Sequence, residues 1–267
     1  MLGRGLFLAL AWLLTVGIAA ACETSPHQTT DMPESVVFSQ TPGPGIRTAW
    51  YDAPTTRYGH GVLGDAIEAG ALYAEAAGPG DGCEVIGIVL DPDHVFEDVA
   101  PRLADLDGDG RNEIITVRAR LDLGAQLAVY GDVGDGDALR LVVATPFIGQ
   151  SNRWLAPVGA ADLDGDGLVE IAYIDRPHLA RILRVWRYRA GTLEEVATLG
   201  GLTNHRIGED YISGGMRDCG GGPEMILATT DWARMVAVRF DGRDLISRDL
   251  GPWSDASAAA ALACAGN

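Results

Sequence analysis

Two stretches of this chain carry the same acidic pattern in the same register. Residues 103–117 read LADLDGDGRNEIITV and residues 160–174 read AADLDGDGLVEIAYI, an offset of 57 residues. A third stretch, residues 214–228, keeps the glutamate and the apolar residues that follow it, and a shorter stretch at residues 62–72 resembles the same unit more weakly. Repetition at a nearly constant spacing restricts the chain to an array of one supersecondary unit, in which each unit needs its neighbours to bury its apolar side.

Each copy continues with short β-rich segments that are separated by turns containing Gly and Asp. Residues 182–188, ILRVWRY, alternate between apolar and polar side chains, as a half-buried strand does. Four short strands joined by tight turns form an antiparallel meander, which is the unit of a β-propeller blade. The predicted strands are 113–117, 126–130, 139–144, 170–174, 182–188, 193–199, 224–229, 235–240 and 244–247, and a short helix is predicted over 255–263.

We therefore expect an all-β fold, a β-propeller of about four blades. The segment around 36–38 or 47–50 is expected to pair with the last blade and close the ring, because an unpaired edge strand invites aggregation. The alternative is an open array that is completed by association. The predicted repeats cover approximately residues 55–100, 101–157, 158–210 and 211–255.

The N-terminus has the pattern of an export signal. Arg4 is followed by an apolar run from Leu6 to Ala21, which ends in small residues and is shorter than the roughly 20 residues that span a membrane. Cys22 comes next and resembles the lipidated cysteine of a bacterial lipoprotein; the alternative is simple secretion with Cys22 in a disulfide. The predicted organisation is a signal peptide (1–21), a flexible tether (22–45) and a repeat domain (46–267) in a protein that is periplasmic, anchored to the outer membrane, or secreted.

The charge of the chain excludes one class of partner. The net charge is −17, from 37 acidic residues against 20 basic residues that are all Arg. Such an acidic protein repels phosphate backbones, so we expect no nucleic-acid partner. No other stretch is apolar enough to cross a membrane, so membrane contact is expected only through an N-terminal lipid anchor.

The two full copies of the acidic pattern place carboxylates at positions 1, 3, 5 and 9 of a short loop. Calcium takes several oxygen ligands, and alternate positions of a tight loop point toward one centre, whereas magnesium demands stricter geometry. An EF-hand would need a Glu at position 12 and a following helix, but position 12 is Thr116 or Tyr173 within a β-rich run. Position 7 is expected to supply a backbone carbonyl. The candidate calcium ligands are Asp105, Asp107, Asp109, Arg111, Glu113, Asp162, Asp164, Asp166, Leu168 and Glu170.

These repeats resemble the FG-GAP/VCBS repeats of integrin-α-like β-propellers. The resemblance implies a propeller that binds calcium through the matching Asp and Glu side chains. This chain departs from the family pattern in having Glu at position 9 and in lacking the Phe-Gly and Gly-Ala-Pro signatures. In the third copy, Met216 and Gly220 stand where acids are expected, and we hypothesise that a disulfide between Cys219 and Cys264 fixes that loop in place of a metal.

Short polar clusters at residues 57–60, 93–94, 152–154 and 204–206 form a second candidate site. If each cluster precedes the innermost strand of a blade, their side chains meet at one mouth of the central channel and could hold an acidic or sugar ligand. The interpretation that we favour is that they hydrogen-bond loops and cap strand ends. The candidate ligand-binding residues are Arg57, His60, Arg153, Trp154, His205 and Arg206.

No catalytic motif occurs in the sequence. There is no GxSxG, HExxH or phosphate-binding Gly loop, and no CxxC pair. We therefore expect a non-catalytic calcium-binding module that binds a protein or glycan at the cell surface. A lectin-like carbohydrate-binding module and, with less support, an extracytoplasmic hydrolase or lyase are the alternatives.

Overall fold

The computed structural model describes residues 30–41, 44–77, 83–132 and 138–265. The predicted signal peptide, Cys22 and the first part of the predicted tether lie outside these residues. None of the helices within the described residues is long and apolar enough to cross a membrane.

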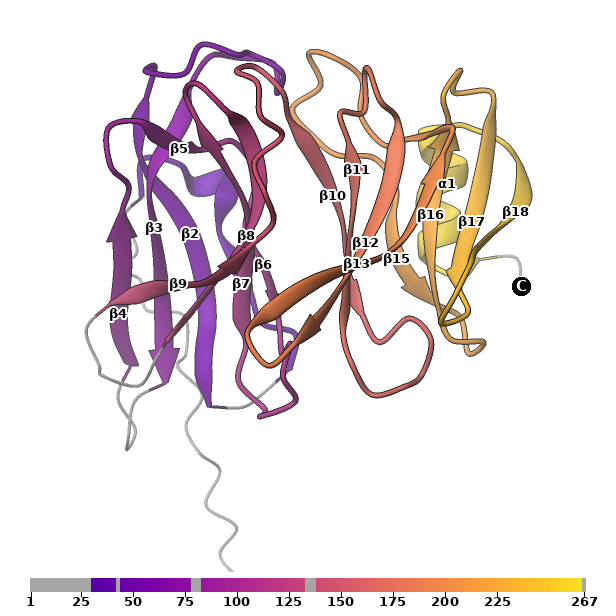
Figure 1. Ribbon diagram of the computed structural model, residues 1–267, viewed down its shortest axis with the longest axis horizontal. Helices are drawn as coiled ribbons and strands as arrows, with labels where there is room; N and C mark the ends of the chain where they lie inside the picture. The colour runs from indigo at the N-terminus through magenta and orange to yellow at the C-terminus, as the bar shows by residue number, and fades with distance from the viewer. Residues whose placement is uncertain (1–29, 42–43, 78–82, 133–137, 266–267) are drawn as a thin grey trace, which may run out of the picture.

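Four antiparallel meanders follow one another along the chain, as expected for an all-β propeller, and Figure 1 shows the three sheets that they form side by side along the longest axis. The first two meanders merge into one sheet, because the short strand β5 pairs with both β3 and β7. The first sheet contains β1 (Val37–Phe38), β2 (Gly45–Thr55), β3 (Glu68–Ala77), β4 (Cys83–Val89), β5 (His94–Phe96), β6 (Arg102–Ala104), β7 (Glu113–Arg120), β8 (Gly124–Asp132) and β9 (Leu139–Ala144).

The other two meanders form separate sheets. In the second sheet the strands lie in chain order, and in the third sheet β14 and β15 both pair with β16. The second sheet contains β10 (Leu155–Ala161), β11 (Glu170–Asp175), β12 (Ile182–Arg189) and β13 (Thr192–Gly200); the third contains β14 (Leu202–Thr203), β15 (Gly215–Asp218), β16 (Pro223–Thr229), β17 (Arg234–Phe240) and β18 (Leu245–Pro252).

All nine predicted strands and the predicted C-terminal helix are present, and their observed bounds differ from the expected ones by a few residues. The helix α1 (Asp255–Leu262) begins with a capping box in which Ser254 and Ser257 bond reciprocally. It packs on the third sheet through Ala258 and Ala261, which contact Ile226. Small side chains let this helix lie close to the strands.

The first meander differs from the prediction. It begins at β1, earlier than the expected repeat start near residue 55, and the part of the predicted tether from Pro33 to Ser35 is a short 3₁₀-helix (η1). The predicted repeat copy at 62–72 covers the β2–β3 connection and the first half of β3 instead of an acidic loop and its strand. The segments 36–38 and 47–50 do not pair with the last sheet, because β1 pairs with β2 through Val37 and Ala49.

The core lies between neighbouring sheets. Val117 and Leu127 of the first sheet pack with Ile171 of the second, and Val185 of the second sheet packs with Leu227 of the third. All five side chains are fully buried. The second sheet therefore buries one face against the first sheet and the other against the third, as the repeat requires.

Loops also bring the third sheet back toward the first. Gly208, between β14 and β15, donates its backbone N–H to the carbonyl of Val62 in the β2–β3 connection, at 3.2 Å. This contact places His60 and His205 near the same end of the molecule, whereas the acidic loops lie at β6–β7 and β10–β11.

Candidate metal centres

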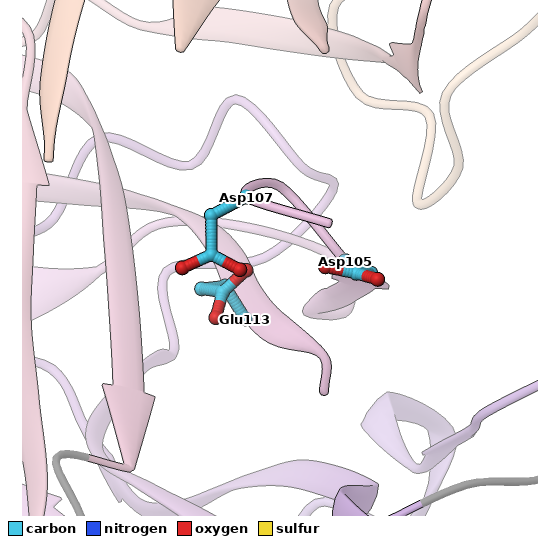
Figure 2. Close-up of side chains that lie close together, drawn as sticks. All are labelled: Asp105, Asp107 and Glu113. Atoms are coloured by element: carbon cyan, nitrogen blue, oxygen red, sulfur yellow. The ribbon is translucent and has the colours of Figure 1, made fainter. Parts of the chain in front are cut away.

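The first acidic loop, called loop 1 (residues 105–113), connects β6 to β7 and gathers three carboxylates. One oxygen from each of Asp105, Asp107 and Glu113 lies within 4.8 Å of the others. Figure 2 shows these three side chains. Both oxygens of Asp105 accept backbone N–H groups, from Gly108 at 2.8 Å and from Gly110 at 2.9 Å. These hydrogen bonds from the loop backbone fix the position of the Asp105 carboxylate.

Loop 2 (residues 162–170), which connects β10 to β11, repeats this geometry. Asp162, Asp164 and Glu170 form the corresponding group within 4.8 Å. The oxygens of Asp162 accept from the N–H groups of Gly165 and Gly167, at 2.8 and 3.0 Å. Two loops 57 residues apart in the chain thus make the same turn with the same hydrogen bonds.

Glycine makes this turn accessible. Gly108 and Gly110 have φ values of 76° and 84°, and Gly165 and Gly167 have values of 81° and 87°. In this left-handed region a side chain would be strained, whereas glycine adopts it freely. The DGDG sequence therefore specifies the backbone as well as the charges.

The third aspartate of each loop lies outside the carboxylate group. Asp109 accepts the N–H of Arg111 at 2.7 Å, and Asp166 accepts the N–H of Leu168 at 2.8 Å. Each of these aspartates closes the turn by bonding to the residue at position 7. The backbone carbonyl of that residue is the expected ligand. Of the four predicted carboxylates in each loop, the structure therefore brings three together.

The two loops differ in their surrounding charges. Burial raises the pKa of Glu113 to about 7, opposed by the N–H of Leu106 and reinforced by the neighbouring aspartates. Burial also raises the pKa of Glu170, but there Arg187 opposes the shift by donating to the carboxylate at 2.6 Å. Within the described part of the chain, none of the four loop 1 carboxylates forms an ion pair with Arg or His.

The donor set fits a hard divalent cation. Every side-chain ligand in each group is a carboxylate oxygen, and three such oxygens converge without an intervening nitrogen or sulfur ligand. Calcium and magnesium take oxygen ligands, whereas zinc sites are typically built from Cys and His. The two acidic groups could therefore hold a metal ion of the calcium or magnesium class.

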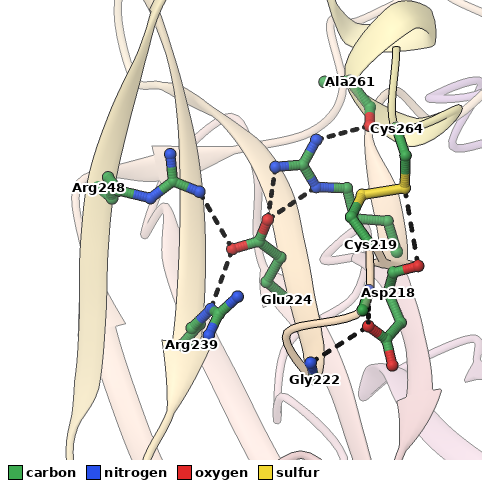
Figure 3. The surroundings of a disulfide bond; sticks show 10 residues. Asp218, Cys219, Gly222, Glu224, Arg239, Arg248, Ala261 and Cys264 are labelled. Carbon is green, nitrogen blue, oxygen red and sulfur yellow. Dashed lines mark hydrogen bonds and ion pairs between the residues drawn. A yellow bond between two sulfur atoms is a disulfide. The ribbon is translucent and has the colours of Figure 1, made fainter. Parts of the chain in front are cut away.

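Loop 3 (residues 216–224) connects β15 to β16 and is held differently, as Figure 3 shows. Cys219 forms a disulfide with Cys264, which is the pair hypothesised from the sequence. The carboxylate of Glu224 accepts from Arg217 at 2.8 Å and from Arg239 at 3.1 Å. Although burial alone raises the pKa of Glu224, these arginines hold it below its ordinary value. A disulfide and arginines thus hold this loop, in which Met216 and Gly220 stand where the other loops have aspartates.

The second candidate site is only partly assembled. His60, Arg153 and Trp154 line one cavity of about 40 Å³, and the His205 ring lies 4.8 Å from the Trp154 ring. Arg57 instead donates to the carbonyl of His94 at 2.8 Å. Arg206 instead lies 3.7 Å from the centre of the Trp232 ring and pairs with Glu209.

Three residues that matter in these sites are not among those predicted from the sequence, because each acts through a contact between distant strands or loops. Glu97 is fully buried and pairs with His60. His178 bonds His205 at 3.0 Å. Arg187 reaches into loop 2 from β12. An alignment of the two strands that follow each acidic loop pairs the glutamate at position 9 with the residue that faces it on the second strand. That pairing could have identified Arg187 from the sequence.

Comparison with known proteins supports the repeat. The family model described as FG-GAP-like repeat matches residues 105–173, which begin at loop 1 and include loop 2. A comparison with curated proteins found no match.

Two solved structures are similar in outline. Exotype rhamnogalacturonan lyase YesX is 16% identical with a TM-score of 0.38, over 81% of this chain and 51% of that chain. Rhamnogalacturonan lyase YesW is 18% identical with a TM-score of 0.39, over 84% of this chain and 55% of that chain. The chain therefore spans about half the length of these two structures. The family match and the paired acidic loops together show that residues 105–173 contain an FG-GAP-like repeat.

Proposed function

We propose that the protein is an exported calcium-binding β-propeller module that binds one calcium ion in loop 1 and one in loop 2. The observation that carries this proposal is the recurrence of one geometry in two separate loops. In each loop three carboxylates converge, and the same glycine N–H groups hold the first aspartate. In loop 1 the converging carboxylates repel one another, and a bound cation would relieve that repulsion. Loop 2 repeats the same geometry, which supports the same kind of ion there.

The proposed ligands are the converging carboxylates, completed by the third aspartate and by the position 7 carbonyl of each loop. Calcium accepts six to eight oxygens in flexible geometry, whereas magnesium needs a stricter octahedron and gives up its water reluctantly. An exposed loop with several carboxylates suits calcium better. The proposed ligands are Asp105, Asp107, Asp109, the carbonyl of Arg111 and Glu113 in loop 1, and Asp162, Asp164, Asp166, the carbonyl of Leu168 and Glu170 in loop 2.

The proposed role is non-catalytic: a binding or scaffold module for a protein or glycan partner at the cell surface. The disulfide between Cys219 and Cys264 is consistent with an extracellular protein. The cavity beside His60 and Trp154, at about 40 Å³, has room for about three water molecules and is too small for a sugar ring. The aromatic and basic groups there serve internal contacts, which favours the scaffold role over a lectin-like one.

Equilibrium dialysis with calcium tests the proposal directly. The purified protein is expected to retain two calcium ions at millimolar concentrations, since extracellular calcium modules commonly have Kd values of about 10⁻⁴–10⁻³ M. Asp107→Asn and Asp164→Asn are each expected to reduce the stoichiometry to one, and the double variant to zero. Asp91→Asn, at an exposed acid outside the loops, is the matched control and is expected to retain two. Absence of bound calcium in the folded wild-type protein would refute the proposal.

A further inference from the structure

The residue that faces the loop glutamate on the next strand differs among the three loops. In loop 2, Glu170 pairs directly with Arg187 of β12. In loop 3, the register of Met225 with Val238 sets Arg239 across from Glu224. In loop 1, the register of Ile114 with Tyr130 sets Gly131 across from Glu113.

Arg187 occupies loop 2 with its guanidinium group. Its Nε donates to Glu170 at 2.6 Å, its Nη1 lies 3.2 Å from Asp166, and its Nη2 pairs with Asp164. The guanidinium carbon also lies 5.8 Å from the centre of the Phe240 ring on the third sheet. Three of the four loop 2 carboxylates are thus already paired with a cation that belongs to the chain.

Loop 1 has open space at the same place. Gly131 has no side chain, and a Cβ added there would lie 3.8 Å from Cγ of Glu113, so a side chain at this position would face the loop. A cavity of about 190 Å³, lined by Asp107, Glu113 and Gly131 among others, fills this space. Arg111 also lines this cavity but pairs with Asp132 at 3.9 Å, so within the described residues no arginine forms an ion pair with the loop 1 carboxylates.

In loop 3, more arginines contact the loop glutamate than in either of the other loops. Arg217, which is 4% exposed, and Arg239 both bind Glu224, and Arg248 adds a third contact at 3.4 Å. Aspartates are missing from the first and third acidic positions, where Met216 and Gly220 stand. Here arginines surround the loop glutamate, and two of the aspartates are absent.

We propose that Arg187 is a tethered cation that competes with calcium for loop 2, so that loop 1 fills first and loop 2 fills only at higher calcium. This inference rests on the proposed calcium binding. Calcium that enters loop 2 must displace the guanidinium from Asp164 and Glu170, or bind beside a like charge at close range. Calcium in loop 1 meets neither cost. The protein would then respond to calcium in two steps, and the second step would loosen the contact of Arg187 with Phe240.

The test measures each loop alone by isothermal titration with calcium chloride. Asp107→Asn leaves only loop 2 able to bind, and Asp164→Asn leaves only loop 1. We expect loop 2 to bind at least about tenfold more weakly than loop 1, and Arg187→Gln in the Asp107→Asn background to recover at least about tenfold, the change that corresponds to about 1.4 kcal/mol. Arg184→Gln is the matched control, because Arg184 lies on the same strand but pairs with Asp175 and Glu195 outside the loop; it is expected to leave the affinity of loop 2 unchanged.

The reverse substitution covers the case in which Arg187→Gln does not fold. Gly131→Arg in the Asp164→Asn background supplies loop 1 with the missing guanidinium and is expected to weaken its calcium binding at least about tenfold. A Cβ at Gly131 would lie 3.1 Å from Cγ2 of Val142, so the valine must shift by a few tenths of an ångström to admit it. Equal affinities of the two loops, or no response to either arginine change, would overturn the role of Arg187 while leaving calcium binding intact. Absence of calcium binding to loop 1 would instead overturn the proposed function itself.

Discussion

Glu224 differs from the other two loop glutamates in being enclosed by arginines. Glu224 and Arg217 have side chains that are each 4% exposed, so neither charge can turn to water if its partner is lost. Removing one partner of a buried ion pair commonly costs about 3–5 kcal/mol, because the other charge stays buried and unpaired. Glu224→Gln is therefore expected to lower the free energy of unfolding by about 3 kcal/mol in urea titrations.

A matched control for this substitution lies on the second sheet. Glu195 pairs with Arg184, but its side chain is 33% exposed, and exposed pairs contribute about 0–1 kcal/mol. Glu195→Gln is expected to change the free energy of unfolding by less than 1 kcal/mol. Equal effects of the two substitutions would mean that Glu224 is solvated in a way that its burial does not indicate.

The histidines near the β2–β3 connection make the protein sensitive to acid. Burial, together with the nearby His205, lowers the pKa of His178 from 6.5 to about 4. Between these values the unfolded chain binds a proton that the folded His178 does not, so the free energy of unfolding falls as pH drops from about 6.5 to about 4. His178→Gln is expected to flatten this part of the stability profile, measured by urea unfolding at several pH values.

Two other histidines are also expected to contribute to the acid dependence. Burial also lowers the pKa of His60 and of His205, so part of the acid dependence is expected to persist in His178→Gln. His94 does not belong to the group of His60, His178 and His205. It pairs with Asp93 instead, so His94→Gln is the control. A profile for His178→Gln that is as steep as the wild-type profile would contradict the assignment.

At the scale of elements, the disulfide joins loop 3 to the end of the helix α1. Cys219 and Cys264 are 45 residues apart in the chain. Closing a loop of that length restricts the unfolded chain by about 4 kcal/mol in the chain-entropy model, and measured effects are typically about 2–4 kcal/mol. Cys219→Ala combined with Cys264→Ala is expected to lower the free energy of unfolding by that amount.

Hydrogen exchange locates this effect. The disulfide and the bond from Arg217 to the carbonyl of Ala261 both hold α1 against the third sheet. The double cysteine variant is therefore expected to lose protection in α1 first, while β11 and β12 of the second sheet keep theirs. Unchanged protection throughout α1 would show that apolar packing alone holds the helix.

Local patterns predicted the strands well, and contacts between distant elements account for the differences. Loop 1 and its following strand could be predicted directly, because the DGDG turn and the β-branched run Ile114–Val117 are local patterns of a few residues. The first meander could not, because its first strand is only the two residues Val37 and Phe38, and the connection to β2 carries no acids. Arg187 was missed because its partners are brought to it only by strand register.

At the scale of the whole molecule, the acidic loops lie where meanders meet. The cavity beside loop 1 is also lined by Gly45 and Ile46 of β2. In loop 2, a Cβ added to Gly242 would lie 3.0 Å from Asp164, so the β17–β18 turn packs against this loop. A cation bound in either loop would therefore stabilise contacts between meanders as well as the turn that holds it.

Calcium is accordingly expected to raise the melting temperature of the whole protein. A ligand at a hundredfold excess over its Kd stabilises the native state by about 2.7 kcal/mol per site. In a chain of this size, 1 kcal/mol corresponds to about 2–4 °C, so one filled site is expected to raise Tm by about 5–10 °C. Differential scanning calorimetry with excess calcium, with magnesium at the same concentration and with EDTA measures this shift. Magnesium is expected to give a smaller rise, because it is held less well by a flexible carboxylate loop. Identical melting curves in calcium and in EDTA would contradict the expectation that the loops couple metal binding to the packing of the sheets.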